Sequence, residues 1–229
     1  MRNIAIITAR GGSKRIPLKN IKPFLNKPII AYSIEAALSS GLFDEVMVST
    51  DDDQIATIAK QYGAMVPFLR TANTASDTAT TADALMEVLY TYQKSGKTFD
   101  YACCLYPTAP FITSEKLINA FNFLLQNNYF SVFPVMPFSY PIWRSLKIEN
   151  GKLEMNYPEY KNTRSQDLPI SYHDAGQFYF FEVEALLAEQ TLFTSNSGAI
   201  IINELEGQDI DNFADWETAE IKYKILFHK

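Results

Sequence analysis

The first 28 residues constrain the fold most, because an apolar strand runs directly into a glycine pair surrounded by positive charge. The predicted strand covers 4–8, and Gly11 and Gly12 follow it. Glycines leave backbone N–H groups uncovered, so a phosphate can approach them closely. The same loop carries four cations, which repel one another unless they face a polyanion: Arg10, Lys14, Arg15 and Lys19. The stretch therefore predicts a site for a polyphosphate such as a nucleoside triphosphate, with a solvated basic loop as the alternative.

The charge of the whole chain is opposite in sign to that of the basic loop. A net charge of −6 argues against nucleic acid or an anionic membrane surface as partner, and it makes the basic loop a local feature. The chain contains no apolar run long enough for a membrane span, and its first residues have a strand pattern instead of a signal peptide. We therefore expect a cytoplasmic protein. The two cysteines, Cys103 and Cys104, are neighbours in a predicted strand, which suits buried packing and neither a disulfide nor a metal site.

Predicted strands and helices alternate through residue 135. Short apolar stretches that indicate strands lie at 4–8, 45–49, 65–68, 101–105 and 131–135. The segments between most of them carry apolar residues at helical spacing. This alternation predicts an α/β domain with a doubly wound, mostly parallel sheet, whose ligands lie beyond the carboxyl ends of the strands. We expect the domain to comprise residues 1–135 and 170–229.

Between these two parts the composition changes. Prolines recur in 136–169 and no helical period remains. Two short apolar stretches flank Glu149-Asn150-Gly151, which predicts a hairpin with an Asn-Gly turn. Such a small β-rich insertion cannot bury a core of its own, so it must pack on the main domain or on another chain. Apolar and aromatic residues within it fit an interface: Tyr140, Ile142, Trp143 and Tyr157.

The basic loop resembles a known signature. Its residues from Ala9 to Asn20 are similar to A-R-G-G-S-K-x-x-P-x-K-N of the CMP-sialic acid synthetase family, the cytidylyltransferases of nine-carbon keto-acid sugars. The resemblance implies a nucleotide-diphospho-sugar transferase-like fold, CTP and an anionic nine-carbon sugar as substrates, and a homodimer in which 136–169 is the dimerisation insertion. It also implies that Arg10 faces the reacting phosphorus. By the same resemblance the nucleotide is held by Ala9, Arg10, Gly11, Gly12, Ser13, Lys14, Lys19 and Asn20.

A second match covers residues 70–79, which are similar to the family's R-x-x-x-x-A-x-D-x-A segment. There the arginine and the backbone near the alanine read the cytosine, which implies base contacts for Arg70 and Ala75 and adds Asp77 to the nucleotide site. A pyrimidine offers a carbonyl acceptor and an amine donor, so a guanidinium and main-chain acceptors could distinguish cytosine from uracil. A surface loop that caps the next helix is the alternative on spacing alone.

Two further stretches resemble the sugar side of the family. Tyr106 stands before Pro107 where the family usually has a glutamine that touches sugar and nucleotide. Residues 164–179 resemble R-x-Q-D-L-P-x-x-Y-x-x-N-G-x-x-Y, with Ala175 in place of the asparagine. Together these departures look most like the pseudaminic acid branch, with the legionaminic and neuraminic branches as alternatives. The resemblance implies sugar contacts for Tyr106, Arg164, Gln166, Tyr172, His173, Asp174, Ala175, Phe178 and Tyr179, and it makes Arg144 from a partner's insertion a candidate for the sugar carboxylate.

Asp209 and Asp211 form the third signal. In extended backbone, alternate side chains share a face, where two carboxylates repel unless a cation lies between them. Hard oxygen ligands with room for water and phosphate suit Mg²⁺, and the resembled family has a metal-binding D-x-D in this place. Capping of the last helix is the competing role, which we assign to Asp215.

These features predict a Mg²⁺-dependent transferase in which the anomeric hydroxyl of a nine-carbon keto-acid sugar attacks the α-phosphorus of CTP. The residues that we expect to carry the chemistry are Arg10, Lys19, Asp209 and Asp211. A transferase for the eight-carbon keto-acid of lipopolysaccharide and a non-catalytic nucleotide-binding regulator are the alternatives. The interpretation requires the basic loop near the start of the chain and the acidic pair near its end to meet across one cleft.

Overall fold

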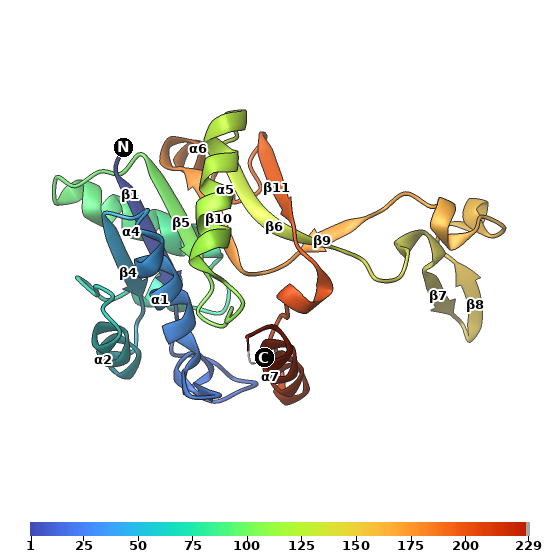
Figure 1. Ribbon diagram of the computed structural model, residues 1–229, viewed down its shortest axis with the longest axis horizontal. Coiled ribbons are helices and arrows are strands. Elements are labelled where there is room, and N and C mark those ends of the chain that lie inside the picture. Colours follow the sequence, from blue (N-terminus) through green and yellow to red (C-terminus); the bar gives the residue numbers. More distant parts are fainter. Residues whose placement is uncertain (228–229) are drawn as a thin grey trace.

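The computed structural model describes residues 1–227, and a seven-stranded sheet forms the middle of its body (Figure 1). The strands lie side by side in the order β11-β6-β10-β5-β1-β4, and β9 pairs with β6. Their bounds are β1 (Asn3–Thr8), β4 (Glu45–Ser49), β5 (Tyr101–Leu105), β6 (Ser131–Pro137), β9 (Tyr172–Asp174), β10 (Phe178–Glu182) and β11 (Ser197–Ile201).

Most of the sheet is parallel, as predicted. Strand β1 is parallel to β4 and β5, and β6 is parallel to β11. Strand β10 lies antiparallel between β5 and β6, and β9 is antiparallel to β6. The strand predicted at 65–68 is wrong, because only an isolated bridge between Met65 and Met47 forms there. Pro67 follows within two residues, and it lacks the N–H that would continue the ladder.

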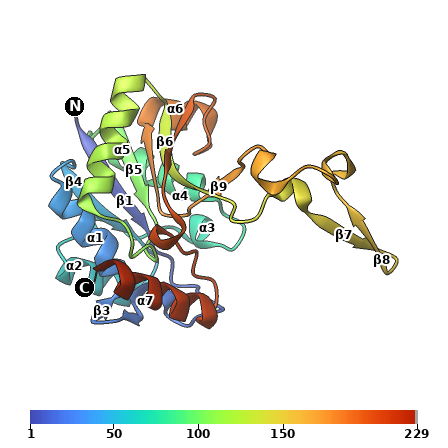
Figure 2. The same ribbon diagram turned by 45° about the vertical axis from the view of Figure 1, so that its right-hand side comes forward.

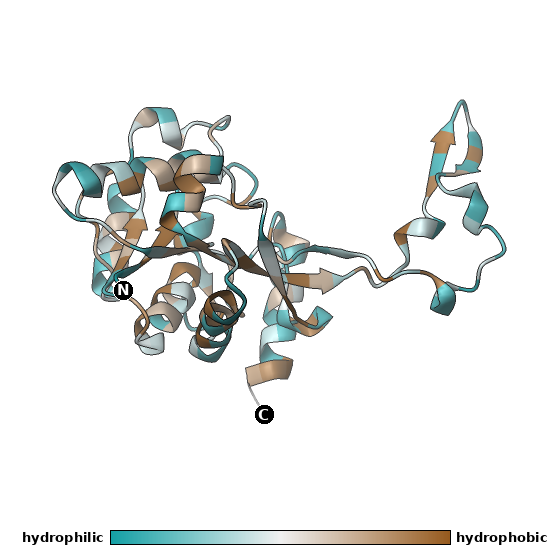
Figure 3. Ribbon diagram, turned by 90° about the horizontal axis from the view of Figure 1, so that it is seen from above, coloured by the Kyte–Doolittle hydropathy of each residue, from teal (hydrophilic) through white to brown (hydrophobic). Residues whose placement is uncertain are grey.

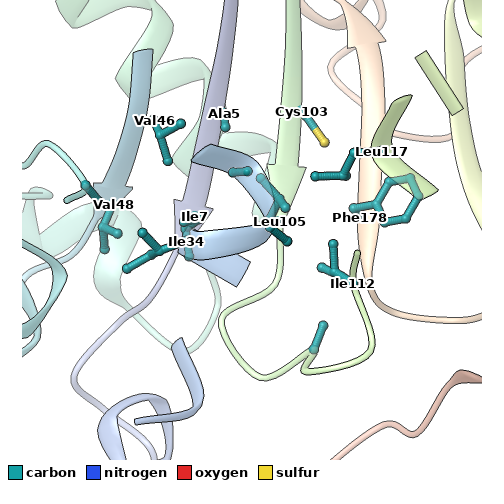
Figure 4. Close-up of a cluster of buried hydrophobic side chains, with 14 of the residues drawn as sticks. Ala5, Ile7, Ile34, Val46, Val48, Cys103, Leu105, Ile112, Leu117 and Phe178 are labelled. Carbon is teal, nitrogen blue, oxygen red and sulfur yellow. The ribbon is translucent and has the colours of Figure 1, made fainter. Parts of the chain in front are cut away.

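Helices cover both faces of the sheet (Figure 3). One face packs against α1 (Ile29–Ser40), α2 (Asp53–Gln61) and α5 (Ser114–Asn127), and the other against α4 (Thr81–Lys94) and α6 (Val183–Glu189). The side chains of Ile7, Leu105 and Phe178 lie on the first face with Ile34 and Leu117 (Figure 4). Among residues 1–227, no helix has the length and apolarity that a membrane span requires.

The neighbouring cysteines point to opposite faces of β5 and are buried, as predicted. Cys103 belongs to the first core cluster and Cys104 to the second. Burial raises the pKa of the Cys103 thiol above its ordinary value and that of Cys104 to about 12.

We expect neither thiol to react with Ellman's reagent at pH 8 in the native protein, since the thiolate is the nucleophile. Both should react once guanidinium unfolds the chain, and a rapid absorbance change from the native protein would contradict this packing.

The last helix, α7 (Phe213–Phe227), packs against the segment that follows the basic loop (Figure 2). That segment contains β2 (Pro23–Phe24) and β3 (Lys27–Pro28), and Phe24 meets Trp216 edge to face at 5.6 Å. Asp215 accepts a hydrogen bond from the Asn212 N–H, and its own N–H donates to the Asn212 side chain. This reciprocal cap confirms the role predicted for Asp215. It also fixes the residues just before α7 beside the basic loop.

Residues 138–171 leave the body between β6 and β9 as an arm (Figures 1 and 3). Its hairpin consists of β7 (Leu146–Glu149) and β8 (Lys152–Met155), and 3-10 helices cover Ile142–Arg144, Pro158–Tyr160 and Ser165–Asp167. Positive φ angles at Asn150 and Gly151 confirm the predicted Asn-Gly turn. Inside the arm, Trp143 packs against Tyr157 and Tyr160 and donates its ring N–H to the Pro169 carbonyl. We define this segment as the arm.

Candidate active site

A cavity of about 530 Å³ lies beyond the carboxyl ends of β1 and β5. Its walls come from the basic loop, from residues 70–81, from the turn after β5 and from the segment before α7. The residues that line it include Arg10, Gly12, Ser13, Lys14, Arg15, Lys19, Asn20, Arg70, Asp77, Tyr106 and Asp209. The basic loop and a carboxylate nearly 200 positions away thus meet across one cleft, as the sequence predicted.

The basic loop is held in place by backbone and carboxylate contacts. The Gly11 N–H donates to the Asp51 carboxylate at 2.9 Å, and the Asn20 amide donates to the Arg10 carbonyl at 2.8 Å. A Cβ on Gly11 would lie 3.0 Å from the Asp52 side chain, which caps α2, so a side chain at this position would crowd that cap. A Cβ on Gly12 would meet nothing within 4 Å. Only Gly12 of the pair lines the cavity.

Ala9 does not line the cavity, so its predicted nucleotide contact is left to its backbone. Its side chain is fully buried, and its N–H donates to the Ser49 carbonyl as a continuation of the β1–β4 pairing. Gly11 is likewise turned toward Asp51 and Asp52. The signature therefore mixes residues that face the cavity with residues that shape the loop.

Lys19 joins the basic loop to the acidic segment. Its Nζ donates to the Ile210 carbonyl at 2.6 Å and lies 3.9 Å from the Asp211 carboxylate, while Arg15 approaches the same carboxylate at 2.7 Å. Burial lowers the pKa of Lys19, and Asp211 opposes that shift. The pKa of Asp209 is raised by desolvation and by the negative charge of Asp211.

The two acidic residues are not equivalent. Asp209 lines the cavity, whereas Asp211 is paired with Arg15. A carboxylate whose pKa is raised by a second carboxylate is a favourable place for a divalent cation. Within residues 1–227, no third His, Cys, Asp or Glu joins this pair to form a metal cluster. The remaining ligands of a cation here would have to be water or substrate oxygens.

Arg70 lies almost completely buried at the carboxyl end of β4. Its Nε donates to the Ser49 hydroxyl at 3.0 Å and one terminal nitrogen donates to the Ser49 carbonyl at 2.9 Å. Burial lowers its pKa, with the Asp51 charge opposing the shift. The short helix α3 (Ala72–Ala75) follows, and Thr74 and Ser76 line the cavity while Ala75 does not. A base contact at Ala75 is therefore restricted to the backbone around it.

Tyr106 is the one residue predicted for the sugar that lines the cavity within this chain. Behind it, Tyr179 donates its hydroxyl hydrogen bond to Asp174 at 2.5 Å, and the other Asp174 oxygen accepts the Gly176 N–H at 2.9 Å. The rings of Tyr106 and Tyr179 are 5.4 Å apart. Burial raises the pKa of both tyrosines, so both hydroxyls stay neutral. Asp174 thus holds Tyr179, whose ring packs against that of Tyr106.

Phe178 and Ala175, both predicted to contact the sugar, are buried and do not line the cavity. Phe178 is 1% exposed and packs in the core on the α1 and α5 side, because alternation along β10 turns it away from Tyr179. Ala175 is 2% exposed and packs with Met136 and Ile202. Both residues pack inside the fold and form no part of the cavity wall.

The other predicted sugar residues lie on the arm or at its base. His173 and Tyr172 lie on β9, and the remainder are Arg144, Arg164 and Gln166. Arg164 pairs with Asp167 at 2.7 Å, and Arg144 donates to the Thr163 carbonyl at 3.0 Å. None of them lines the cavity of its own chain.

Sequence reasoning missed several small polar residues of the cavity. Thr8 ends β1, Thr108 follows β5, and the Thr81 hydroxyl lies 3.4 Å from the Tyr106 hydroxyl. For Thr8 and Thr108 the signal in the sequence is position, because residues that end or follow strands of a parallel sheet lie at the ligand-binding edge. Thr81 begins α4 and carries no such signal.

The chain resembles proteins of known activity over nearly its whole length. It is 43% identical to the pseudaminic acid cytidylyltransferase of Campylobacter jejuni subsp. jejuni serotype O:23/36 (strain 81-176), covering 98% of this chain and 97% of that protein. It is 34% identical to the CMP-N,N'-diacetyllegionaminic acid synthase of Legionella pneumophila, covering 96% and 95%. The solved structure of CMP:2-keto-3-deoxy-manno-octonic acid synthetase complexed with CTP matches the fold with a TM-score of 0.74 at 17% identity, over 99% of this chain and 100% of that one.

This structural match confirms the predicted fold class, and the sequence matches confirm the resemblance first recognised in the basic loop. Residues 4–197 match the cytidylyltransferase family profile, and with these full-length relatives that match shows that the chain belongs to the cytidylyltransferase family.

Proposed function

We propose that this cytidylyltransferase transfers CMP from CTP to the anomeric hydroxyl of pseudaminic acid and releases pyrophosphate. The observation that carries the proposal is the single cavity in which the basic loop, Arg70 and Asp209 meet. The choice of sugar is supported by the name of the Campylobacter jejuni relative and its 43% identity to this chain. We place the reaction in the cytoplasm, where CTP is available.

In this proposal the CTP base lies toward Arg70 and the phosphates lie toward the basic loop. Ser49 holds the Arg70 guanidinium in one orientation, so its donors are set before the base arrives. The sugar oxygen forms a bond to the α-phosphorus while the bond from that phosphorus to the bridging oxygen breaks. Pyrophosphate leaves, and the hydroxyl proton passes to water. Arg10 and Lys19 offset the charge on the phosphate oxygens.

The proposal includes Mg²⁺ held by Asp209 and Asp211. Two carboxylates leave most coordination positions to water and phosphate oxygens, which is how Mg²⁺ is usually bound beside nucleoside triphosphates. Desolvation and the negative charge of Asp211 raise the pKa of Asp209, and a cation between the two carboxylates would offset both; Arg15 now provides the positive charge beside Asp211. When bound, the ion would neutralise phosphate charge and lower the pKa of the attacking hydroxyl.

The acceptor sugar would contact Tyr106, whose neutral hydroxyl replaces an amide of the resembled family. We further propose a homodimer in which the arm of one chain brings Arg144, Arg164 and Gln166 over the cavity of the other. The arm supports this proposal because one face of its hairpin is apolar. Ile148 pairs with Leu153 there, and their exposed fractions are 74% and 65%. The opposite face carries charged pairs such as Lys147 and Glu154.

Charges on the apolar face of the hairpin should disrupt this dimer. We expect the double variant Ile148→Asp and Leu153→Asp to elute as a monomer in size-exclusion chromatography with light scattering. The matched variant Lys147→Ala and Glu154→Ala alters the other face and should leave the mass unchanged. A dimeric double variant would rule out the hairpin as the contact.

A pyrophosphate-release panel of nucleotides against several keto-acid sugars tests the function. We expect turnover with CTP and pseudaminic acid in the presence of Mg²⁺, and weaker or no turnover with the legionaminic, neuraminic or eight-carbon acids. Preference for another sugar would reassign the acceptor. A rise of the melting temperature with CTP but no turnover with any sugar would instead indicate a nucleotide-binding regulator.

A further inference from the structure

The Asp77 carboxylate forms ion pairs with two of the cations that a triphosphate would need, Arg10 and Lys14. The Arg10 guanidinium lies 2.9 Å from one oxygen of its carboxylate, and the Lys14 ammonium lies 2.5 Å from the other. Arg10 also donates to the carbonyl of the preceding residue, Ser76, at 3.0 Å. The partners are more than 60 positions apart in the sequence, and all four residues line the cavity. These contacts therefore join two walls of the cavity across its interior.

The loop that carries Asp77 is anchored at both ends. At its start the Thr71 N–H and hydroxyl donate to Glu87 at 2.8 and 3.0 Å, and Thr74 donates to the same carboxylate. At its end Thr80 and Asp83 form a reciprocal cap on α4. Between these anchors, Ser76 and Asp77 contact Arg10 and Lys14 of the basic loop. The position of Asp77 is thus set by the loop, and its contacts with the cations are not incidental.

The Asp77 ion pairs are exposed, so an incoming anion can exchange with the carboxylate. Lys14 and Arg10 lower the pKa of Asp77, so its carboxylate is ionised at neutral pH. Its side chain is 53% exposed, and that of Lys14 is 78% exposed. Exposed ion pairs contribute little net free energy, so an incoming phosphate can replace the carboxylate.

We propose that Asp77 is an internal counter-ion that weakens the binding of every polyphosphate at the basic loop. A phosphate chain must displace Asp77 from Arg10 and Lys14 in order to bind. A nucleotide gains further contacts with the same loop, which begins at Arg70, whereas a base-free polyphosphate gains none. CTP can therefore offset the cost of displacing Asp77 through its base, whereas a free polyphosphate, including the pyrophosphate product, cannot. This inference rests on the proposed nucleotide site but not on the identity of the sugar.

The test measures the dissociation constants of CTP and of inorganic tripolyphosphate by isothermal titration calorimetry in metal-free buffer. The Asp77→Asn variant keeps the size of the side chain and removes its charge. We expect tripolyphosphate to bind about fivefold more tightly to the variant, because up to two exposed ion pairs no longer compete. CTP should gain by a similar factor, because its phosphates displace the same carboxylate.

Asp53→Asn is the matched control, because it changes the net charge equally at an exposed position in the first turn of α2. It should leave both constants unchanged. Asp77→Ser provides a second variant if the asparagine lowers the melting temperature. Unchanged or weaker tripolyphosphate binding in both Asp77 variants would overturn the proposal. If tripolyphosphate binds and tightens but CTP shows no preference in the wild type, the counter-ion role stands and the nucleotide site fails.

Discussion

Replacing Asp209 by asparagine should lower kcat by about 100-fold or more and leave the protein folded. Asp209 is the member of the Asp209 and Asp211 pair that lines the cavity, and we propose that it holds Mg²⁺ against the phosphates. Loss of one fixed group that stabilises charge in a transition state typically costs about 100- to 1,000-fold. Pyrophosphate release at saturating CTP and sugar measures the effect. Wild-type turnover by the variant would contradict the metal role.

The same variant should not lose stability in metal-free buffer. The pKa of Asp209 is raised in the fold, so its ionised form is disfavoured there. A carboxyl with a raised pKa lowers the stability of the folded protein at pH values above its unfolded pKa, and the neutral amide removes that effect. Adding Mg²⁺ should raise the melting temperature of the wild type more than that of the variant. Asp53→Asn, which makes the same charge change on α2, should behave like the wild type.

Most of the fold follows from local sequence patterns. Short continuous apolar runs placed β1 and β5, and the position of the neighbouring cysteines on opposite faces of β5 follows from the strand period of two. Strand direction does not follow from such patterns. The run Phe178–Glu182 is apolar in the same way as the parallel strands, yet it enters the sheet from the arm and lies antiparallel between β5 and β6.

The site was predictable as a set of residues but not as a set of roles. The resemblance named Asp77, Asp174 and Tyr179 without indicating which groups they contact. In the structure Asp174 and Tyr179 bond to each other behind Tyr106, and Asp77 pairs with cations more than 60 positions away. Contacts of this kind depend on how distant loops meet. A motif therefore identifies the residues of the site, whereas the fold decides which of them face the cavity.

Replacing Lys19 by glutamine should lower kcat/KM by about 100-fold or more, because the variant removes a cation from the cavity wall at the junction of both loops. Lys60→Gln, on the exposed side of α2, is the control and should retain activity. Lys19→Gln should still fold, since the lost hydrogen bond to the Ile210 carbonyl can be remade by the amide. Full activity of the glutamine variant would exclude Lys19 from phosphate binding.

The Lys19→Arg variant should keep the positive charge of Lys19 and remove its titration at alkaline pH. Burial lowers the pKa of Lys19 below its ordinary value, so its positive charge is lost at a lower pH than that of an exposed lysine. If this charge is needed, wild-type kcat/KM should fall on the alkaline side of the profile as pH rises through that lowered pKa. A guanidinium stays protonated throughout this range. The arginine variant should therefore lose the alkaline decline. Its kcat/KM at the optimum pH should be lower than that of the wild type, because a guanidinium is larger than an ammonium group. An alkaline limb that is unchanged in Lys19→Arg would assign the titration to another group and leave Lys19 with a structural role at the Ile210 carbonyl.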